Sequence, residues 1–431
     1  PNMADSTFHT VVRGKATKAI IHPTFASKQV LAVAPKILTD ELIIYLHNRS
    51  ATNTYSNTDD EPIKFQIPLN NGFLDFPHHE FRFTAYLTPN AGVGNHRFSK
   101  GIDCIISKIS LMSKGALVHE ILQYARKENI IRQWTEVAAK DTQWKEFDGT
   151  GSAADRDAVG PSPGQEYIIQ INHPLLIEEI ISTHLAVLKE INEIWITLAN
   201  PNTFAEKTSG TSGTVTLTVS NPCFIVPRVS LPKDIASTIM ARQSSGVHEI
   251  HMERWLYEAV PIGAADTSLT KKFTRHYKSI KAILLQFQPT ANLTDKDTNS
   301  KFISFSRPSN LTFQLTKNNI KYPREPEDDY KLWFKRLMWH LGFWGNGHRG
   351  SNNDTDMTYA DFLTTKFCLF FPAHPYPMPG AIGGWDTSID GSELTIDLTF
   401  TAPGAAWTMH TWLIIDEVLK VMSNGEIVSV T

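Results

Sequence analysis

Two short glycine motifs are the parts of the sequence that come nearest to a catalytic signature. GPSPG at residues 160–164 has the letters of the G-x-S-x-G nucleophile elbow, in which the amide after the serine helps to stabilise an oxyanion. Pro163 occupies that place and has no amide hydrogen to donate. GNGHRG at 345–350 fits G-x-G-x-x-G, but it follows a predicted helix and leads into polar SNNDTD, whereas phosphate binding needs a strand before and a helix after. Neither motif therefore predicts acyl transfer or nucleotide binding.

Histidines are the other groups that could do chemistry, as metal ligands. The chain has 16 of them, including the pairs His78 with His79 and His248 with His251, but it has neither H-E-x-x-H nor C-x-x-C. On a strand, the HEIH segment would point its two histidines to opposite faces. We predict turns and interfaces for these histidines, and no catalytic, cofactor or metal site. The paired carboxylates of a glycosidase could still be hidden among 44 acidic residues.

The cysteines and the ends of the sequence bear on the compartment. The three cysteines are widely spaced, odd in number and lie in apolar stretches, which favours buried free thiols in a reducing compartment: Cys104, Cys223 and Cys368. The N-terminal residues PNMADSTFHT lack the pattern of a signal peptide, and no apolar run approaches the ~18 residues that span a bilayer. We therefore expect a soluble protein without membrane insertion.

Charge gives little reason to expect nucleic-acid binding. The formal net charge is −3, so no global attraction to a polyanion follows. One basic cluster precedes the apolar segment ILLQF, and it consists of Lys271, Lys272, Arg275, Lys278 and Lys281. It fits a charged edge strand, or alternatively a contact with a neighbouring subunit or with nucleic acid. A group of aromatics is more simply core packing under a helix than a ligand cage: Trp333, Phe334, Trp339, Phe343 and Trp344.

The elements that must carry these residues are mostly strands. The chain has 431 residues, of which 41% are hydrophobic, with 24 Gly and 24 Pro throughout, a composition that favours two turn-rich β domains. Short apolar stretches separated by polar turns recur, as at 42–46, 81–87, 102–112 and 167–171. Strict alternation at 215–219 and at 394–400 predicts strands with one buried face and one wet face.

Two helices are predicted within the β pattern. Apolar residues at i, i+3, i+4, i+7 and i+11 from Tyr330 predict a helix that begins after Asp329 and ends near Gly342 as a C-cap. A first helix is predicted over about 118–134, with Val118, Ile121, Leu122 and Ala125 on one face.

These helices point to an internal duplication. Each follows a similar strand, KISLMSKGALVHEI before the first and LTFQLTKNNIKYPRE before the second, so that Ile109 aligns with Phe313 (313 − 109 = 204). We also pair the alternating strand at Val215 with that at Leu394 (394 − 215 = 179), and place the connection between the units around 226–243. The sequence therefore predicts an all-β protein of two consecutive eight-stranded jelly-roll β-sandwiches, residues 1–228 and 229–431, with a short helix inserted in each.

Long polar insertions are where surface function would lie. They cover 146–165, 204–213, 347–356 and 372–391. Loops of this length are usually functional or mobile, and in a jelly roll they gather at the ends of the sandwich.

The order of these elements, and the texture of residues 44–83 and 280–315, resemble the major capsid proteins of double-jelly-roll DNA viruses, nearest to the Polinton, adintovirus and virophage members. The resemblance covers the whole chain and rests on no short diagnostic motif. It implies a structural, non-enzymatic protein whose homotrimers form pseudo-hexameric capsomers, which contact neighbouring capsomers, penton and minor capsid proteins in an icosahedral virion shell. It also implies synthesis inside the host cell, in cytoplasm or nucleus. The net charge, for its part, predicts no specific nucleic-acid partner.

Two alternatives remain open at this point. A carbohydrate-binding or glycan-cleaving protein of two jelly rolls would share the strand pattern, although the missing signal peptide and disulfides count against it. A vertex or spike component of a virion is the other, and the duplication argues against that role.

Overall fold

The computed structural model describes the strands and helices of two β-sandwiches. It describes residues 42–47, 54–57, 61–67, 73–74, 78–99, 101–113, 115–135, 164–177, 193–208, 210, 213–229, 237, 248–293, 304–344, 358–373, 384–388, 393–421 and 427–430. Among these residues, no helix combines the length and the apolar character that crossing a bilayer requires.

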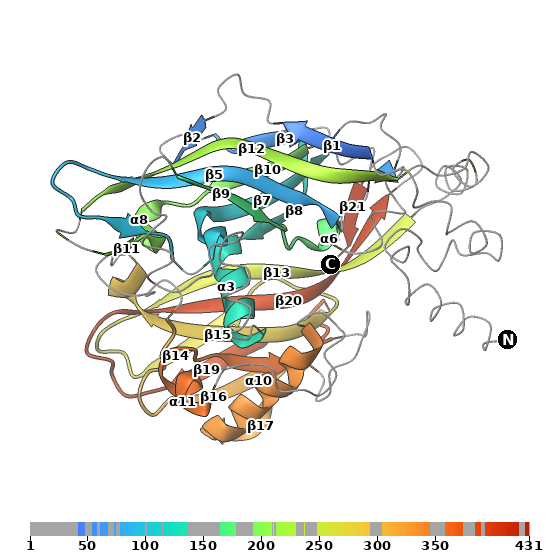
Figure 1. Cartoon of the computed structure of the whole chain (residues 1–431). Coiled ribbons are helices and arrows are strands. Elements are labelled where there is room, and N and C mark those ends of the chain that lie inside the picture. Colours follow the sequence, from blue (N-terminus) through green and yellow to red (C-terminus); the bar gives the residue numbers. More distant parts are fainter. Residues whose placement is uncertain are drawn as a thin grey trace.

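The first sandwich is built from two antiparallel sheets (Figure 1). One has the order β1-β12-β5-β9, with β1 Leu42–His47, β12 Val215–Val229, β5 Glu80–Pro89 and β9 Gln165–Ile169. The other has the order β3-β10-β7-β8, with β3 Ile63–Gln66, β10 Glu193–Leu198, β7 Ile106–Ser113 and β8 Ala116–Leu122. Short strands complete this half: β2 Thr54–Ser56 and β4 Phe73–Leu74 pair with β12, and β6 His96–Arg97 pairs with β11 Glu206–Lys207.

The second sandwich repeats this arrangement. Its first sheet has the order β13-β20-β15-β18, with β13 His248–Ile262, β20 Trp407–Val421, β15 Ile280–Pro289 and β18 Leu369–Pro372, and β21 Ile427–Val430 pairs with β20. Its second sheet has the order β14-β19-β16-β17, with β14 Ser268–Phe273, β19 Leu394–Thr399, β16 Thr312–Lys317 and β17 Ile320–Glu327.

The two strand orders are identical when strands are counted along the chain. In each half the first principal strand pairs with the eighth, the eighth with the third and the third with the sixth, while the second, seventh, fourth and fifth form the other sheet. This is the jelly-roll connection, made twice. The predicted all-β class, with two jelly rolls of eight strands and a helix inserted in each, is confirmed.

The duplication corrects one predicted alignment. Ile109 and Phe313 do occupy equivalent places, because Ile109 pairs with Ile196 in β10 and Phe313 with Leu398 in β19. The strand at Val215 is the eighth of its unit, whereas the strand at Leu394 is the seventh, so pairing these two was wrong. The reason is that β12 continues without a break through Phe224, whereas the second half divides its similar stretches between β19 and β20.

The helices lie between the fifth and sixth strands of each unit. In the first half α3 spans Tyr124–Thr135, and in the second α10 spans Tyr330–Trp344 and α11 spans Tyr359–Thr364. Shorter helical segments are η4 Ile102–Ile105, α6 Pro174–Ile177, α8 Pro201–Phe204 and η6 Thr290–Leu293.

The start of α10 is as predicted, since the Asp329 carboxylate accepts bonds from the amides of Lys331 and Leu332. Its end is not, because the helix continues through Gly342 to Trp344.

The predicted first helix was wrong over its first turn. Residues 116–122 form strand β8, which pairs with β7 so that Ile109 faces Ile121. Here the buried side chains alternate, with His119 and Ile121 inside, and the helix begins only after Gln123, whose φ is 51°. The apolar spacing fitted both structures, and pairing with β7 decides between them because it gives the backbone of 116–122 its hydrogen bonds.

Each sandwich has its own core, yet each core also contains residues from the other half of the chain. Met252 and Leu419, from β13 and β20, belong to the core of the first half, and Ile130 from α3 belongs to the core of the second. Helix α3 lies between the two sandwiches, against the sheet of β13, β20 and β15 (Figure 1). The division of the chain between residues 228 and 229 stays a prediction; β12 ends at Val229 and β13 begins at His248.

Candidate functional site

The most unusual chemistry in the structure lies at the seam, which we define as the contact of α3, β8 and the segment 171–175 with β13, β15 and β20. The first turns of α3 are buried, although they carry four consecutive polar residues, Arg126 to Asn129. Burying charged groups is favourable only when partners replace the water that they lose. The seam therefore has to supply those partners.

Arg126 finds its partners in the second sandwich. Its Nη1 lies 3.2 Å from Gln288 Oε1 and 3.1 Å from His410 Nε2, and the Tyr257 hydroxyl lies 2.8 Å from His410 Nδ1. A guanidinium can only donate, so His410 accepts at Nε2 and is neutral, with its proton at Nδ1 facing Tyr257. Burial, and then the Arg126 charge, hold the pKa of His410 well below its ordinary value.

Lys127 and Glu128 satisfy each other within the first half. Lys127 Nζ lies 3.2 Å from Glu128 Oε1 and 3.3 Å from the backbone carbonyl of Asn172, while Nδ2 of the Asn172 side chain donates to Glu128 Oε2 at 3.0 Å. The Lys127 ammonium also lies 5.5 Å from the ring centre of Trp255, on β13 of the second half. This pair therefore neutralises its own charge and still contacts the other sandwich.

A pair of histidines, one on β8 and one in the segment 171–175, lies on the first-half side of the seam. The Leu175 amide donates to His173 Nδ1 at 3.1 Å, so the proton of His173 is at Nε2, which lies 2.9 Å from His119 Nδ1. His119 accepts there and carries its own proton at Nε2, which lies 3.5 Å from Glu417 Oε2 on β20. The other oxygen of Glu417 accepts from Arg254 Nη1 at 3.0 Å.

Both imidazoles of this pair are neutral. Burial lowers the pKa of His119 to about 3, with smaller contributions from the Arg254 and Lys127 charges, and burial also holds the pKa of His173 well below its usual value. The close approach of His119 and Glu417 is therefore a polar contact and not an ion pair, since a neutral imidazole carries no charge. The charge of Glu417 is balanced by Arg254.

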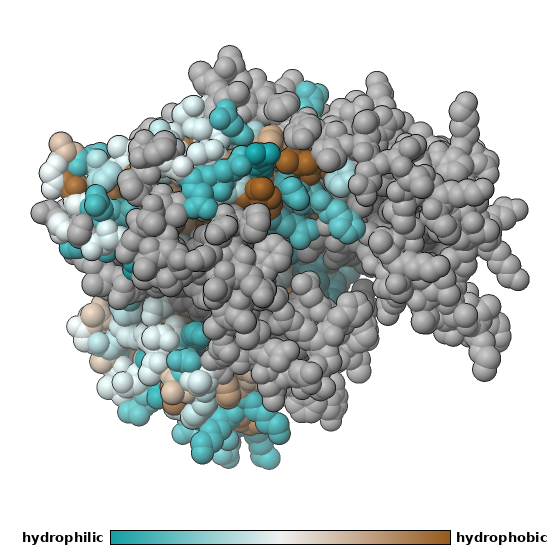
Figure 2. Space-filling view, in the orientation of Figure 1, coloured by the Kyte–Doolittle hydropathy of each residue, from teal (hydrophilic) through white to brown (hydrophobic). Residues whose placement is uncertain are grey.

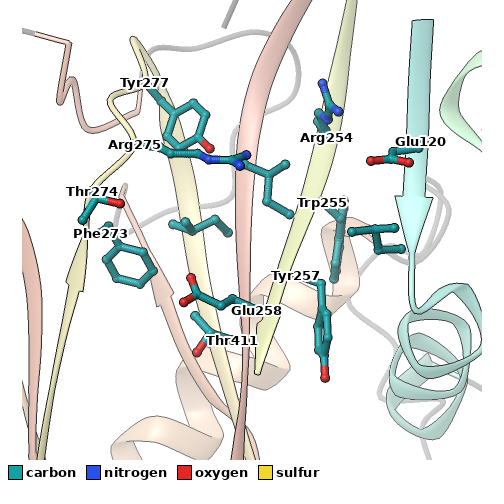
Figure 3. A pocket seen from close by; sticks show the side chains of 13 residues that line it. Glu120, Arg254, Trp255, Tyr257, Glu258, Phe273, Thr274, Arg275, Tyr277 and Thr411 are labelled. Carbon is teal, nitrogen blue, oxygen red and sulfur yellow. The ribbon is translucent and has the colours of Figure 1, made fainter. Parts of the chain in front are cut away.

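A groove of about 450 Å³ opens beside the seam (Figure 3). Its walls come from β8, from β13 and from the segment that follows β14. Two residues of β20, Thr411 and Leu413, also line it. Arg254 belongs to both the groove and the seam.

Exposed large hydrophobic side chains mark one kind of strand. Among the described residues they are Leu117 and Leu122 on β8 and Ile320 and Tyr322 on β17. Both strands are the fifth of their unit and form an edge of their sheet. In Figure 2 the lower part of the molecule, where Figure 1 places β17 and α10, shows brown residues among teal ones.

The residues singled out from the sequence do not form a catalytic group. GPSPG before Gly164 and the whole of GNGHRG lie outside the described residues, as do most of the long insertions. His79 is buried and its Nε2 accepts from the Ile171 amide, while His248 and His251 lie on β13. Within the described part of the chain no cluster of His, Cys, Asp or Glu side chains is placed to hold a metal ion. All three cysteines carry free thiols, and Cys104 and Cys368 are buried.

The basic cluster is divided between two sheets. Lys271 and Lys272 lie on the edge strand β14 and pair with Glu258 and Glu393, which confirms the charged-edge interpretation for these two lysines. Lys281 lies on β15 instead, 2.8 Å from both Glu253 and Asp416. Of the aromatic group, Trp333 is buried in the second core and Phe334 packs against that core, as predicted.

Sequence reasoning missed the seam. The polar residues at the start of α3 were given no role, and His119 was placed in a helix rather than a strand. The signal that was present is Gly115, at a φ of 84° between two apolar segments, which indicates a hairpin.

Comparisons with known proteins agree on the fold. No family model and no curated protein sequence matches the chain. Three similar solved structures are the capsid of the virus PBCV-1, the mavirus major capsid protein and the Faustovirus major capsid protein, with TM-scores of 0.59, 0.51 and 0.55 and sequence identities of 10%, 9% and 9%. The matches cover 90%, 90% and 88% of this chain and 97%, 89% and 90% of those chains. The chain therefore has the double-jelly-roll fold that those capsid proteins have.

Proposed function

We propose that this chain is a major capsid protein, and that three copies form a pseudo-hexameric capsomer that tiles an icosahedral virion shell. The similarity to viral capsid proteins over about nine tenths of the chain supports a structural role. Two equivalent sandwiches in one chain support the pseudo-hexamer, because three chains then supply six similar lobes to a threefold ring.

One observation carries this proposal: equivalent elements of the two halves differ in burial. In the first half β8 and α3 lie at the seam, and the described residues of α3 from Tyr124 to Ile130 are buried. In the second half β17 is exposed along most of its length, with 56% of Ile320 and 48% of Tyr322 open to solvent. A second copy that meets β17 and α10 with its first sandwich would repeat the contact that the chain already makes within itself.

The remaining parts of the proposal concern partners and place. The protein would act in the virion, after synthesis inside the host cell, together with penton and minor capsid proteins, without inserting into a membrane and without enzymatic activity. A net charge of −3, and the acidic partners of Lys271, Lys272 and Lys281, support the absence of a specific nucleic-acid site.

Assembly of the purified protein tests the proposal. Light scattering should give the mass of a trimer, and negative-stain electron microscopy should show threefold particles. The double variant Ile320→Glu with Tyr322→Glu should remain folded, because both side chains are exposed, but should be monomeric since it buries two charges in the contact. Ser268→Glu, on the opposite edge of the same sheet, is the matched control and should still form trimers.

Two outcomes would contradict the proposal. A wild-type protein that stays monomeric at high concentration and binds glycans would favour the carbohydrate-binding alternative. A trimer that survives the double variant would show that β17 is not the contact between copies.

A further inference from the structure

The groove beside the seam runs along the edge of a strand. It is lined by five consecutive residues of β13, Arg254 to Glu258. Successive side chains of a strand point to opposite faces, so all five can line one groove only if that groove follows the strand's edge. β13 pairs with β20 on one side, and no other described strand pairs with it. The amides and carbonyls on its second edge therefore face the groove.

Two buried polar atoms at the groove have no partner. Thr411 is 1% exposed and its hydroxyl makes no hydrogen bond, and Arg254 Nε is buried without an acceptor although Nη1 of the same side chain serves Glu417. Both residues line the groove. Buried polar groups are nearly always hydrogen-bonded, so these atoms indicate that the groove takes a polar ligand.

The rim of the groove carries opposite charges. In Figure 3, Arg275 and Glu120 enter from opposite sides and Arg254 lies between them. Glu258 is paired with Lys271, and Arg254 is paired with Glu417. Arg275 is exposed and no ion pair involves it in the described part of the chain. The unbalanced positive charge at this rim is therefore that of Arg275, which lies on the side opposite Glu120.

We propose that the groove binds an extended peptide of a partner protein, which adds a strand to the free edge of β13 and places an acidic side chain beside Arg275. The free edge supplies main-chain hydrogen bonds, Leu256 offers an apolar contact to an alternate side chain, and Arg254 Nε on the same strand donates to the peptide. Thr411 and Leu413 lie on β20, one strand further from that edge. A volume of about 450 Å³ is within the usual range of ligand sites. The proposal does not depend on trimer assembly.

A labelled probe peptide tests it on the full chain. The probe is about six residues long, a typical strand length, and alternates valine with aspartate. We expect saturable binding by fluorescence anisotropy, together with slower amide hydrogen exchange across residues 254–258. A second probe with proline at alternate positions lacks the amides that a ladder needs and should not bind. Equal binding of both probes would overturn strand addition.

Charge variants test whether an acidic side chain of the peptide lies beside Arg275. Arg275→Glu should weaken binding of the aspartate probe about tenfold or more, whereas Lys278→Glu, an exposed change in the same segment outside the groove, should leave it within about twofold. Equal affinities of the two variants would overturn the role of Arg275. Light scattering of each sample records assembly separately, so that a failed trimer and a failed peptide site are distinguishable.

Two other occupants are decided by the same measurements. If decanoate slows exchange at 254–258 and the peptide does not, the groove takes an aliphatic anion. If exchange there slows with protein concentration alone, the occupant is a second copy of the chain. Either result overturns the proposal.

Discussion

The outer faces of the two equivalent sheets differ in burial. In the first sandwich the face formed by β5 and β12 carries Thr84 opposite Ser220, and both side chains are partly exposed. In the second, Leu284 lies opposite Trp412 at the corresponding place, and both are fully buried. The strand order is thus duplicated while the faces have diverged, one toward water and one toward α3.

The burial patterns along the strands show the same difference. β5 alternates strictly between buried and half-exposed residues, whereas β15 is buried from Ala282 through Gln288 on both faces. A strand covered on both sides needs apolar or hydrogen-bonded residues at every position. The composition of β15 and β20 is therefore set by their contact with the seam, since the same jelly-roll positions in the first sandwich tolerate polar residues on the outer face.

Removing the largest side chain on the covered face should give the largest difference in stability between the two sandwiches. Trp412→Ala should lower the free energy of unfolding by about 3–5 kcal/mol, because it leaves a cavity at the seam, on the covered face of β20. Ser220→Ala, at the corresponding place in the first sandwich, should change that free energy by less than about 0.5 kcal/mol. Denaturant unfolding of both variants measures the difference. Similar losses for the two would mean that the faces are equally covered.

The arginines offer a second, smaller contrast. Arg126→Ala should cost about 2–3 kcal/mol, because Gln288 Oε1 and His410 Nε2 lose a buried donor. Arg82→Ala removes an ion pair with Glu166 in which both side chains are nearly half exposed, and it should cost less than about 1 kcal/mol. Thermal unfolding of the matched pair, at one pH and one salt concentration, checks this order. A larger loss in Arg82→Ala would reverse the interpretation of the seam.

Between about pH 6.5 and 5, acid should act through the buried histidines of the seam. The pKa of His119 is lowered to about 3 in the folded chain and those of His173 and His410 are also depressed, so the unfolded chain binds more protons below about pH 6.5. Stability is therefore complete above that pH and falls as the pH decreases from 6.5, by up to about 1.4 kcal/mol per pH unit for each histidine.

Substituting one histidine sharpens this test. His119→Gln cannot be protonated, so the slope of unfolding free energy between about pH 6.5 and 5 should decrease by roughly the share of one histidine. Ser220→Ala, which leaves every titratable group in place, serves as the control and should keep the wild-type slope. An unchanged slope in His119→Gln would show that this imidazole does not remain neutral in the folded state.

The sequence predicted β19 correctly, a strand with one buried and one exposed face. The alternation at Leu394, Ile396 and Leu398 predicted β19 because its buried and exposed positions differ in residue type. At β8 the same reasoning failed, since Val118, Ile121 and Leu122 fit a helix as well as a strand until β7 pairs with them. Local pattern cannot decide such a segment, because the deciding hydrogen bonds come from elsewhere in the chain.

The seam could not be predicted, for a related reason. His119, His173, Arg254 and Glu417 meet only after both sandwiches have formed, and no spacing in the sequence brings them together. Their types are ordinary on a surface, so their burial left no compositional trace. The groove is equally hidden, because an edge strand such as β13 differs from a central one by its neighbours and not by its residues.

Helix α3 also has a consequence for the order of events during synthesis. Ile130 belongs to the core of the second sandwich, and Arg126 has its partners on Gln288 and His410. The ribosome synthesises α3 long before those residues. In the nascent first half, Arg126 therefore has no hydrogen-bond partners on the second sandwich, and Ile130 has no core to pack against. We therefore expect the two halves to reach their final packing together, because the core of the first sandwich is completed only when β20 contributes Leu419.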